Sequence, residues 1–252
     1  MDKDLIKQCR FFLKDTIRKM IDFSRTDQYL GVPPPPIQKP FSQDAKRIVL
    51  PGMKAWQDIG KADFKAIILN RESHRSYLEE ALTLGELAFL LWASQGIKER
   101  LDEGHALRTV PSAGCRHSLE TYLCVLNIDG LERGIYRYLP LEHQLLLLYT
   151  DQDLDEKIFE ATFNQSYPAV AAVTLIWTTI PYRMEWRYGP ASAKVIAIEA
   201  GHACQNLYLA CEAIGAGACA MAAYDQQAMD HLLHIDGEDE FTLYLASVGR
   251  KL

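Results

Sequence analysis

Two arginines flank a hydroxyl in the run Asn70-Arg71-Glu72-Ser73-His74-Arg75. Side chains alternate between the two sides of an extended chain, so Arg71, Ser73 and Arg75 would point the same way. Two guanidiniums and a hydroxyl suit a phosphate monoester, because arginine can bind phosphate through two parallel hydrogen bonds. The pattern therefore predicts an anion site, with a solvated charged segment as the ordinary alternative.

A second candidate is the turn Pro111-Ser112-Ala113-Gly114. Its small side chains would let backbone amides and one hydroxyl approach a flat ring system closely. An ordinary turn before a strand would explain the same residues. Two cations, Arg250 and Lys251, directly follow an apolar run close to the last residue of the sequence, Leu252. These two could close over an anion or form a plain charged terminus.

Several other kinds of site are excluded. The run Gly215-Ala216-Gly217 follows a predicted helix and enters a predicted strand, which reverses the order required of a dinucleotide-binding fingerprint, and it lacks the third glycine. The His231-x-x-His234 pair has no acidic or thiol ligand at metal spacing, so we expect no metal. A net charge of −6 without a concentrated basic face argues against binding to nucleic acid.

The chain carries no predicted membrane span or secretion signal. The most apolar run, residues 169–180, is shorter than the roughly 18 residues that would suggest a transmembrane helix. The N-terminus mixes acidic and basic residues without an apolar core, unlike a signal peptide. We therefore expect a cytoplasmic protein with reduced cysteines.

Helical and strand patterns alternate irregularly along the chain, which indicates an α+β fold with a central mixed or antiparallel sheet flanked by helices. A Thr83-x-x-Glu86 capping box predicts the start of a helix that Gly96 ends. The predicted helices cover residues 4–23, 84–95, 153–163, 192–214 and 226–233. The predicted strands cover residues 121–128, 134–138, 144–149, 169–180, 217–223 and 241–248, and the second and third of these form a hairpin.

Two segments suggest contacts beyond one compact core. Residues 1–60 combine a helix with the proline-rich run GVPPPPIQKP, so we treat them as an extended arm and residues 61–252 as the main domain. Such an arm lies over its own domain or over a partner, or is disordered. The 192–214 helix is apolar around most of its circumference and rich in small residues, which favours a subunit interface, although core packing would explain the same composition.

The order of these motifs resembles the nitroreductase superfamily and, more narrowly, its SagB-type branch of flavin dehydrogenases related to azoline-oxidising enzymes. The resemblance covers about residues 70–252. It is carried by R-x-S-x-R, R-T-x-P-S-A-G, G-x-Y-R-Y, E-A-G-H-x-x-Q-N-L, G-x-G-x-C and a terminal V-G-R. The proline-rich arm is also typical of the branch.

The resemblance implies a nitroreductase-like fold in an intertwined homodimer with FMN at the subunit interface. Arg71, Ser73 and Arg75 would hold the FMN phosphate and ribityl chain, and Arg250 with Lys251 would complete the phosphate site. The turn Pro111, Ser112, Ala113 and Gly114 would reach the flavin from the other subunit. Ala222 and Ala223 would lie at the flavin N5 region, although many relatives have Glu-Gly there.

No catalytic acid or base is assigned by the resemblance. Lys194, His117 and Tyr224 are the candidates; Lys194 lies where azoline oxidases have a Lys-Tyr pair, but Val195 replaces the tyrosine. Three hypotheses stay open at this point. The first is an NAD(P)H-dependent reductase of small acceptors, the second a SagB-type dehydrogenase of a peptide or small metabolite, and the third a non-catalytic flavin-binding partner subunit.

Overall fold

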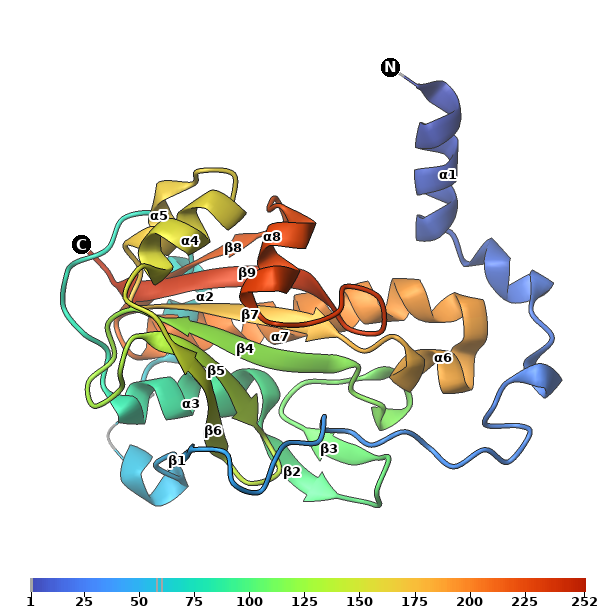
Figure 1. The fold of residues 1–252 in the computed structure, drawn as a ribbon, viewed down its shortest axis with the longest axis horizontal. Helices are drawn as coiled ribbons and strands as arrows, with labels where there is room; N and C mark the ends of the chain where they lie inside the picture. The colour runs from blue at the N-terminus through green and yellow to red at the C-terminus, as the bar shows by residue number, and fades with distance from the viewer. Residues whose placement is uncertain (1, 58, 60) are drawn as a thin grey trace.

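A seven-stranded antiparallel sheet lies at the centre of the molecule, in the strand order β1-β6-β5-β4-β7-β9-β8 (Figure 1). The computed structural model describes residues 2–57, 59 and 61–252. A separate small hairpin pairs β2 with β3. The strands are β1 (Arg47–Val49), β2 (Ile97–Arg100), β3 (Ala106–Arg108), β4 (Leu119–Val125), β5 (Gly134–Leu139), β6 (Gln144–Thr150), β7 (Val173–Thr179), β8 (Ala216–Met221) and β9 (Phe241–Arg250).

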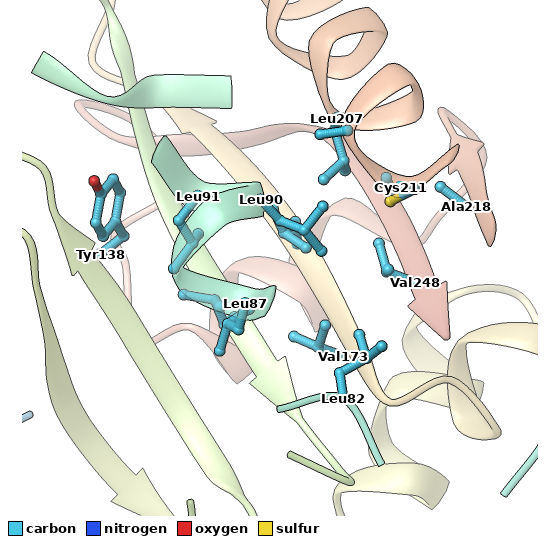
Figure 2. Close-up of a cluster of buried hydrophobic side chains, with 14 of the residues drawn as sticks. Leu82, Leu87, Leu90, Leu91, Tyr138, Val173, Leu207, Cys211, Ala218 and Val248 are labelled. Carbon is cyan, nitrogen blue, oxygen red and sulfur yellow. The ribbon is translucent and has the colours of Figure 1, made fainter. Parts of the chain in front are cut away.

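Helices cover both faces of this sheet. The helices are α1 (Lys3–Leu13), α2 (Phe64–Asn70), α3 (Leu84–Gln95), α4 (Leu154–Ala161), α5 (Ser166–Ala169), α6 (Tyr182–Tyr188), α7 (Ser192–Ala213) and α8 (Gln226–Leu232). Helices α3 and α7 pack on one face, where Leu90 and Leu207 meet Val173 and Val248 of the sheet (Figure 2). Helices α4, α5 and α8 pack on the other face. The predicted α+β fold is confirmed.

Side-chain alternation explains why the central strands are apolar throughout. In β4, Leu119 and Leu123 belong to the cluster under α3 and α7, whereas Tyr122 and Cys124 belong to the cluster under α4 and α8. Successive side chains of a strand point to opposite faces, so a strand covered on both sides needs apolar residues at both parities. This requirement produces a nearly continuous apolar run.

Several predicted elements are confirmed. Helix α3 begins after a capping box in which Thr83 accepts a hydrogen bond from the Glu86 amide while Glu86 accepts one from the Thr83 amide. Its bounds match the predicted 84–95. The β5–β6 hairpin, helix α7 and strands β8 and β9 also form within a few residues of their predicted bounds.

Other predictions about the elements are wrong. The helix predicted over residues 4–23 ends at Leu13, because Lys14 is extended, and two short 3-10 turns follow. No buried side chain stabilises this segment, and short helices without packing are marginal in water. The strand predicted from residue 169 begins only at Val173, after the short helix α5. Strands β1, β2 and β3 and helices α2 and α6 were not predicted.

The proline-rich arm lies along its own domain, which was one of the predicted possibilities (Figure 1). Side chains of the domain donate hydrogen bonds to backbone carbonyls of the arm: Trp186 to Val32, Arg116 to Pro35, Arg108 to Ile37, and Arg137 to Lys39 and Pro40. An extended polyproline backbone has no internal hydrogen bonds, so its carbonyls need such donors when buried. The predicted domain boundary, residue 60, lies outside the described residues.

Candidate flavin site

The 71–75 segment runs along the outer edge of β8. Ser73 forms a parallel bridge with Ala218, and the His74 amide donates a hydrogen bond of 2.9 Å to the Ala218 carbonyl. Gly217 allows this close approach, because a Cβ atom there would lie 2.6 Å from the His74 ring. The strand edge thus places the predicted anion-binding residues at a defined position.

Tyr208 of α7 joins this segment to the end of β8. Its hydroxyl lies 2.9 Å from the Ser73 hydroxyl and accepts a hydrogen bond of 2.8 Å from the Ala220 amide. The Arg71 guanidinium lies over the Tyr208 ring, 5.4 Å from its centroid. Three motifs that are far apart in the sequence therefore meet at one tyrosine.

Arg75 takes a different direction from Arg71. Its guanidinium lies 5.9 Å from the centroid of Tyr167 in α5, which belongs to the helix layer on the opposite face of the sheet from α7. The prediction that the side chains point the same way therefore holds for Arg71 and Ser73 at Tyr208, but Arg75 contacts another ring. Among the described residues, no carboxylate forms an ion pair with Arg71 or Arg75.

Arg250 and Lys251 already have carboxylate partners. Arg250 lies 2.8 Å from Glu86 and 3.4 Å from Glu80, and Lys251 lies 2.8 Å from Glu212. Both cations lie at the end of β9, which pairs with the start of β8. An anion bound here would compete with these carboxylates.

The remaining predicted residues near β8 lie at its far end. Ala222 and Ala223 are exposed and directly follow the strand. The Tyr224 hydroxyl donates a hydrogen bond of 2.9 Å to the Thr242 carbonyl, which is a packing contact.

Lys194 lies in the first turn of α7 and lines a small cavity with Phe11 of α1. It is 14 residues from Tyr208, or about 21 Å along the helix axis.

The 111–114 turn has an unusual backbone. Gly114 has a φ of 61°, and a Cβ atom there would lie 2.8 Å from the Tyr188 hydroxyl. Cys115 and His117 also have positive φ angles, 55° and 48°, which residues with side chains rarely adopt. Such geometry persists only where its surroundings impose it, and it concentrates at functional sites.

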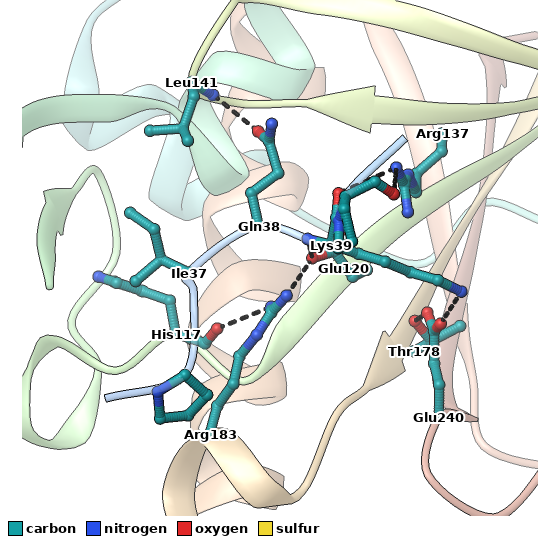
Figure 3. Close-up of polar contacts among 12 residues, drawn as sticks. Ile37, Gln38, Lys39, His117, Glu120, Arg137, Leu141, Thr178, Arg183 and Glu240 are labelled. Atoms are coloured by element: carbon teal, nitrogen blue, oxygen red, sulfur yellow. Dashed lines mark hydrogen bonds and ion pairs between the residues drawn. The ribbon is translucent and has the colours of Figure 1, made fainter. Parts of the chain in front are cut away.

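Hydrogen bonds to buried polar residues of the domain fix the position of this turn. The Ser112 hydroxyl donates a hydrogen bond of 2.9 Å to Glu199 of α7 and accepts one of 2.9 Å from the His117 amide. Arg183 donates hydrogen bonds to the His117 carbonyl, at 3.3 Å, and to Glu120, at 2.6 Å (Figure 3). The turn is therefore fixed to β4, α6 and α7.

The electrostatics of these residues follow from their burial. Burial and the nearby guanidinium of Arg108 lower the pKa of His117 to about 2, so this imidazole is neutral. Burial raises the pKa of Glu199 to about 7, although the Ser112 hydrogen bond acts in the opposite direction. Burial opposes ionisation of Glu120, but the guanidiniums of Arg183 and Arg137 outweigh it and lower the pKa of that carboxyl.

Sequence reasoning missed the roles of Glu199, Tyr208 and Arg183. A signal for Glu199 was present, because an acidic residue interrupts the buried stripe formed by Ile196, Ala200 and Ala203. Acidic residues are rarely fully buried unless they are paired. No comparable signal marks Tyr208, since a tyrosine on a mostly apolar helix is ordinary packing.

The nitroreductase family model matches residues 68–250, which is most of the chain. The chain belongs to the nitroreductase family. A provisionally named nitroreductase of Methanocaldococcus jannaschii is 31% identical over 195 residues, covering 77% of this chain and 94% of the relative.

Solved structures show the same nitroreductase fold. One is a provisionally named nitroreductase of Ralstonia eutropha, with a TM-score of 0.68 and 22% identity, covering 87% of this chain and 99% of that chain. Another belongs to the microcin synthetase complex McbBCD of E. coli with a truncated precursor bound, with a TM-score of 0.61 and 18% identity, covering 85% of this chain and 78% of that chain. At these identities the likeness shows the fold alone.

Among the described residues, no helix is both long and apolar enough to cross a membrane. In the same part of the chain, no group of three or more histidine, cysteine, aspartate or glutamate side chains could hold a metal ion.

Proposed function

We propose that this nitroreductase-family chain is an FMN-dependent oxidoreductase. The observation that carries the proposal is the convergence at Tyr208, where Arg71 and Ser73 meet the amide of Ala220 near the end of β8. A guanidinium and a hydroxyl thus lie beside the strand whose continuation, Ala222 and Ala223, is exposed.

The residues present fit the phosphate of FMN. Arg71 and Arg75 have no carboxylate partner among the described residues, so their charges are available to a phosphate once the Arg75 side chain turns from the Tyr167 ring toward Arg71. Arg binds phosphate in a planar, bidentate manner. Arg250 and Lys251 would contribute by exchanging Glu80, Glu86 or Glu212 for the phosphate, so we propose a secondary role for these two.

The ring system would be held by residues of two subunits. We propose that Pro111, Ser112, Ala113 and Gly114 reach the flavin of the partner subunit, and that α7 supplies the interface of a homodimer. One side of α7 is open in the single chain: Ala197 and Gly201 are exposed, and a Cβ at Gly201 would meet nothing within 4 Å. Small residues let a second helix approach closely.

When bound, FMN would supply the hydride chemistry, with NAD(P)H as the proposed electron donor and a small molecule or peptide as the substrate. The chain's own residues would bind the cofactor and donate hydrogen bonds to it. None of the three residues predicted for proton transfer has a free side chain at the candidate site: His117 is 1% exposed, Tyr224 donates to a backbone carbonyl, and Lys194 lies beside α1.

The proposal is tested by purifying the protein and measuring its flavin. We expect a yellow protein with noncovalent FMN. The Arg71→Ala and Arg75→Ala variants should each lose charge-assisted phosphate bonds worth on the order of 1.5–3 kcal/mol, which is roughly a tenfold or greater loss of FMN affinity. Arg47→Ala is a matched control, because Arg47 lies over the Phe41 ring at 5.4 Å, outside the site. A colourless protein that binds FAD instead would contradict the proposal.

A second candidate function is that of a SagB-type dehydrogenase acting on a peptide or small metabolite. The fold likeness to a chain of a microcin synthetase complex supports it. Azoline oxidation is disfavoured because Lys194 lies beside α1 and is followed by Val195. Anaerobic mixing with NADH, NADPH and candidate substrates in turn separates the functions. Bleaching by NAD(P)H alone supports the reductase, bleaching by a substrate supports the dehydrogenase, and no bleaching supports a non-catalytic partner subunit.

A further inference from the structure

Two buried polar atoms without hydrogen-bond partners face each other beneath the 111–114 turn. They are Nδ1 of His117 and Oε1 of Glu199, 3.8 Å apart, on side chains that are each 1% exposed. A buried polar atom without a partner costs roughly 1–3 kcal/mol. Two such atoms directed at one another therefore need an explanation.

The surrounding hydrogen bonds determine where protons can be. Nε2 of His117 lies 2.8 Å from the Ala106 carbonyl, which can only accept, so Nε2 carries a hydrogen. In the neutral imidazole Nδ1 then has a bare lone pair. Oε2 of Glu199 accepts from Ser112 at 2.9 Å and from Ser118 at 3.4 Å, which leaves Oε1 to face Nδ1. With Glu199 ionised, two lone pairs would confront each other.

One proton between these atoms removes the conflict. A protonated Glu199 would donate from Oε1 to Nδ1 once the two side chains close from 3.8 Å to hydrogen-bond distance, while Oε2 would still accept from the two serines. The proton belongs on the carboxyl rather than on the imidazole, because burial and the nearby guanidiniums of Arg108, Arg183 and Arg116 all disfavour an imidazolium and lower the pKa of His117. The same Arg108 and Arg183 favour the carboxylate, but burial outweighs them and raises the pKa of Glu199.

We propose that Glu199 is a positioning residue that takes up one proton from water, shares it with His117, and thereby links its protonation to the flavin contacted by the 111–114 turn. Ser112 is the mechanical link, because its hydroxyl joins Glu199 to the backbone of the turn. This inference rests on the proposed function. It goes further by naming a group whose charge changes beneath the 111–114 turn, where an ionised Glu199 would disfavour additional negative charge on a flavin bound at that turn.

The proton itself can be observed without activity or flavin chemistry. Infrared difference spectra of the purified protein between about pH 5 and about pH 9 should show loss of a protonated carboxyl band as Glu199 ionises. Glu199→Gln should lack that band, because its amide keeps a donor toward Nδ1 and an acceptor for Ser112 but cannot titrate. An identical spectrum in the variant would overturn the shared proton.

A second measurement covers the case in which Glu199→Gln does not fold. The ¹⁵N resonance of His117 Nδ1 in the unaltered protein should move through the same pH range as the infrared band, because Nδ1 loses its donor when Glu199 ionises. The Nε2 resonance should keep the chemical shift of a protonated nitrogen throughout this pH range. A Nδ1 resonance that does not move would contradict the proposal.

The link to flavin is tested by the pH dependence of its reduction potential. We expect a change of slope at the pH where the infrared band disappears, and no change of slope in Glu199→Gln. A slope change that survives in the variant would overturn the link and leave the proposed function intact. A protein that binds no FMN would overturn both the proposed function and the link, whereas the infrared result would still report on the shared proton.

Discussion

Removal of the Glu120 carboxylate should destabilise the protein strongly, because this group compensates several buried donors. Its Oε1 accepts hydrogen bonds from Arg183 at 2.6 Å and from the Lys39 amide of the arm at 2.7 Å (Figure 3). The side chains of Glu120 and Arg183 are both 2% exposed. A Glu120→Ala change would leave the Arg183 guanidinium buried without a counterion.

The expected loss follows from this burial. Removing one partner of a buried ion pair costs about 3–5 kcal/mol, because the remaining charge is uncompensated. Asp155→Ala is a matched control, since Asp155 pairs with Arg133 at 2.8 Å but the two side chains are 44% and 33% exposed. Such exposed pairs contribute roughly 0–1 kcal/mol. The double change Glu120→Leu with Arg183→Met should cost less than Glu120→Ala, because no lone charge is left behind.

Urea denaturation at one protein concentration and one flavin content measures these differences, since ligand and oligomerisation would otherwise shift the apparent stability. Protease accessibility of the proline-rich arm gives a second measurement of the same change. Loss of the acceptor for the Lys39 amide should make residues 32–40 more accessible to proteases in Glu120→Ala than in the control. A loss below about 1 kcal/mol, equal to that of Asp155→Ala, would refute the idea that this buried pair holds the arm and the turn.

Three further changes test other parts of the structure. Gly217→Ala should cost about 1–3 kcal/mol and weaken FMN binding, because its Cβ would strike the His74 ring; unchanged FMN titrations would contradict this. Gly201→Leu should reduce both the dimer fraction in sedimentation and the flavin content, and a native monomer with full FMN would exclude the shared site. In Glu199→Gln, the free energy of unfolding should fall by about 1.4 kcal/mol for each pH unit below 6.5, the ordinary pKa of a histidine such as His117. In the unaltered protein, these two groups should leave the free energy of unfolding independent of pH down to about pH 4.5. The sign follows from the protons that each state binds. Because the His117 pKa is lowered in the folded state, only the unfolded chain gains a proton on His117 below pH 6.5; in the unaltered protein this is balanced by the proton that the raised Glu199 pKa keeps in the folded state. Urea midpoints measured across this pH range test the prediction.

Local signals explain which parts of the fold could be predicted from the sequence. The capping box at Thr83 and the apolar periodicity of α3 are decided within a few residues, so the predicted bounds matched the helix. Strand β1 could not be found this way, because Arg47–Val49 has the burial of a surface segment and becomes a strand only by pairing with β6. Only Ala169 of the short helix α5 lies in the apolar run 169–180, and the apolar character of that run does not mark where strand β7 begins.

The site shows the same division between local and long-range causes. Arg71 and Ser73 could be singled out because their spacing is a local property, and α2 ends at Asn70 so that the chain is extended after Arg71. Their position depends on Ala218, about 145 residues later, through a strand-edge bridge that no periodicity reveals. The direction of Arg75 was misjudged for the same reason, since Tyr167 of α5 offers its guanidinium a ring on the other face.

The buried charges suggest why the arm and the candidate site are built as one unit. Arg108 donates to the arm carbonyl of Ile37, and Arg183 donates both to the carbonyl of His117 and to Glu120, which in turn accepts from the arm. A charge at 2–6% exposure is tolerable only with fixed partners. Undocking the arm would therefore take one carbonyl acceptor each from Arg108 and Arg116, two buried guanidiniums that lie near His117. The carbonyls of the proline-rich segment therefore supply acceptors for the buried arginines around the strained 112–117 backbone, and these hydrogen bonds help to keep that backbone in place.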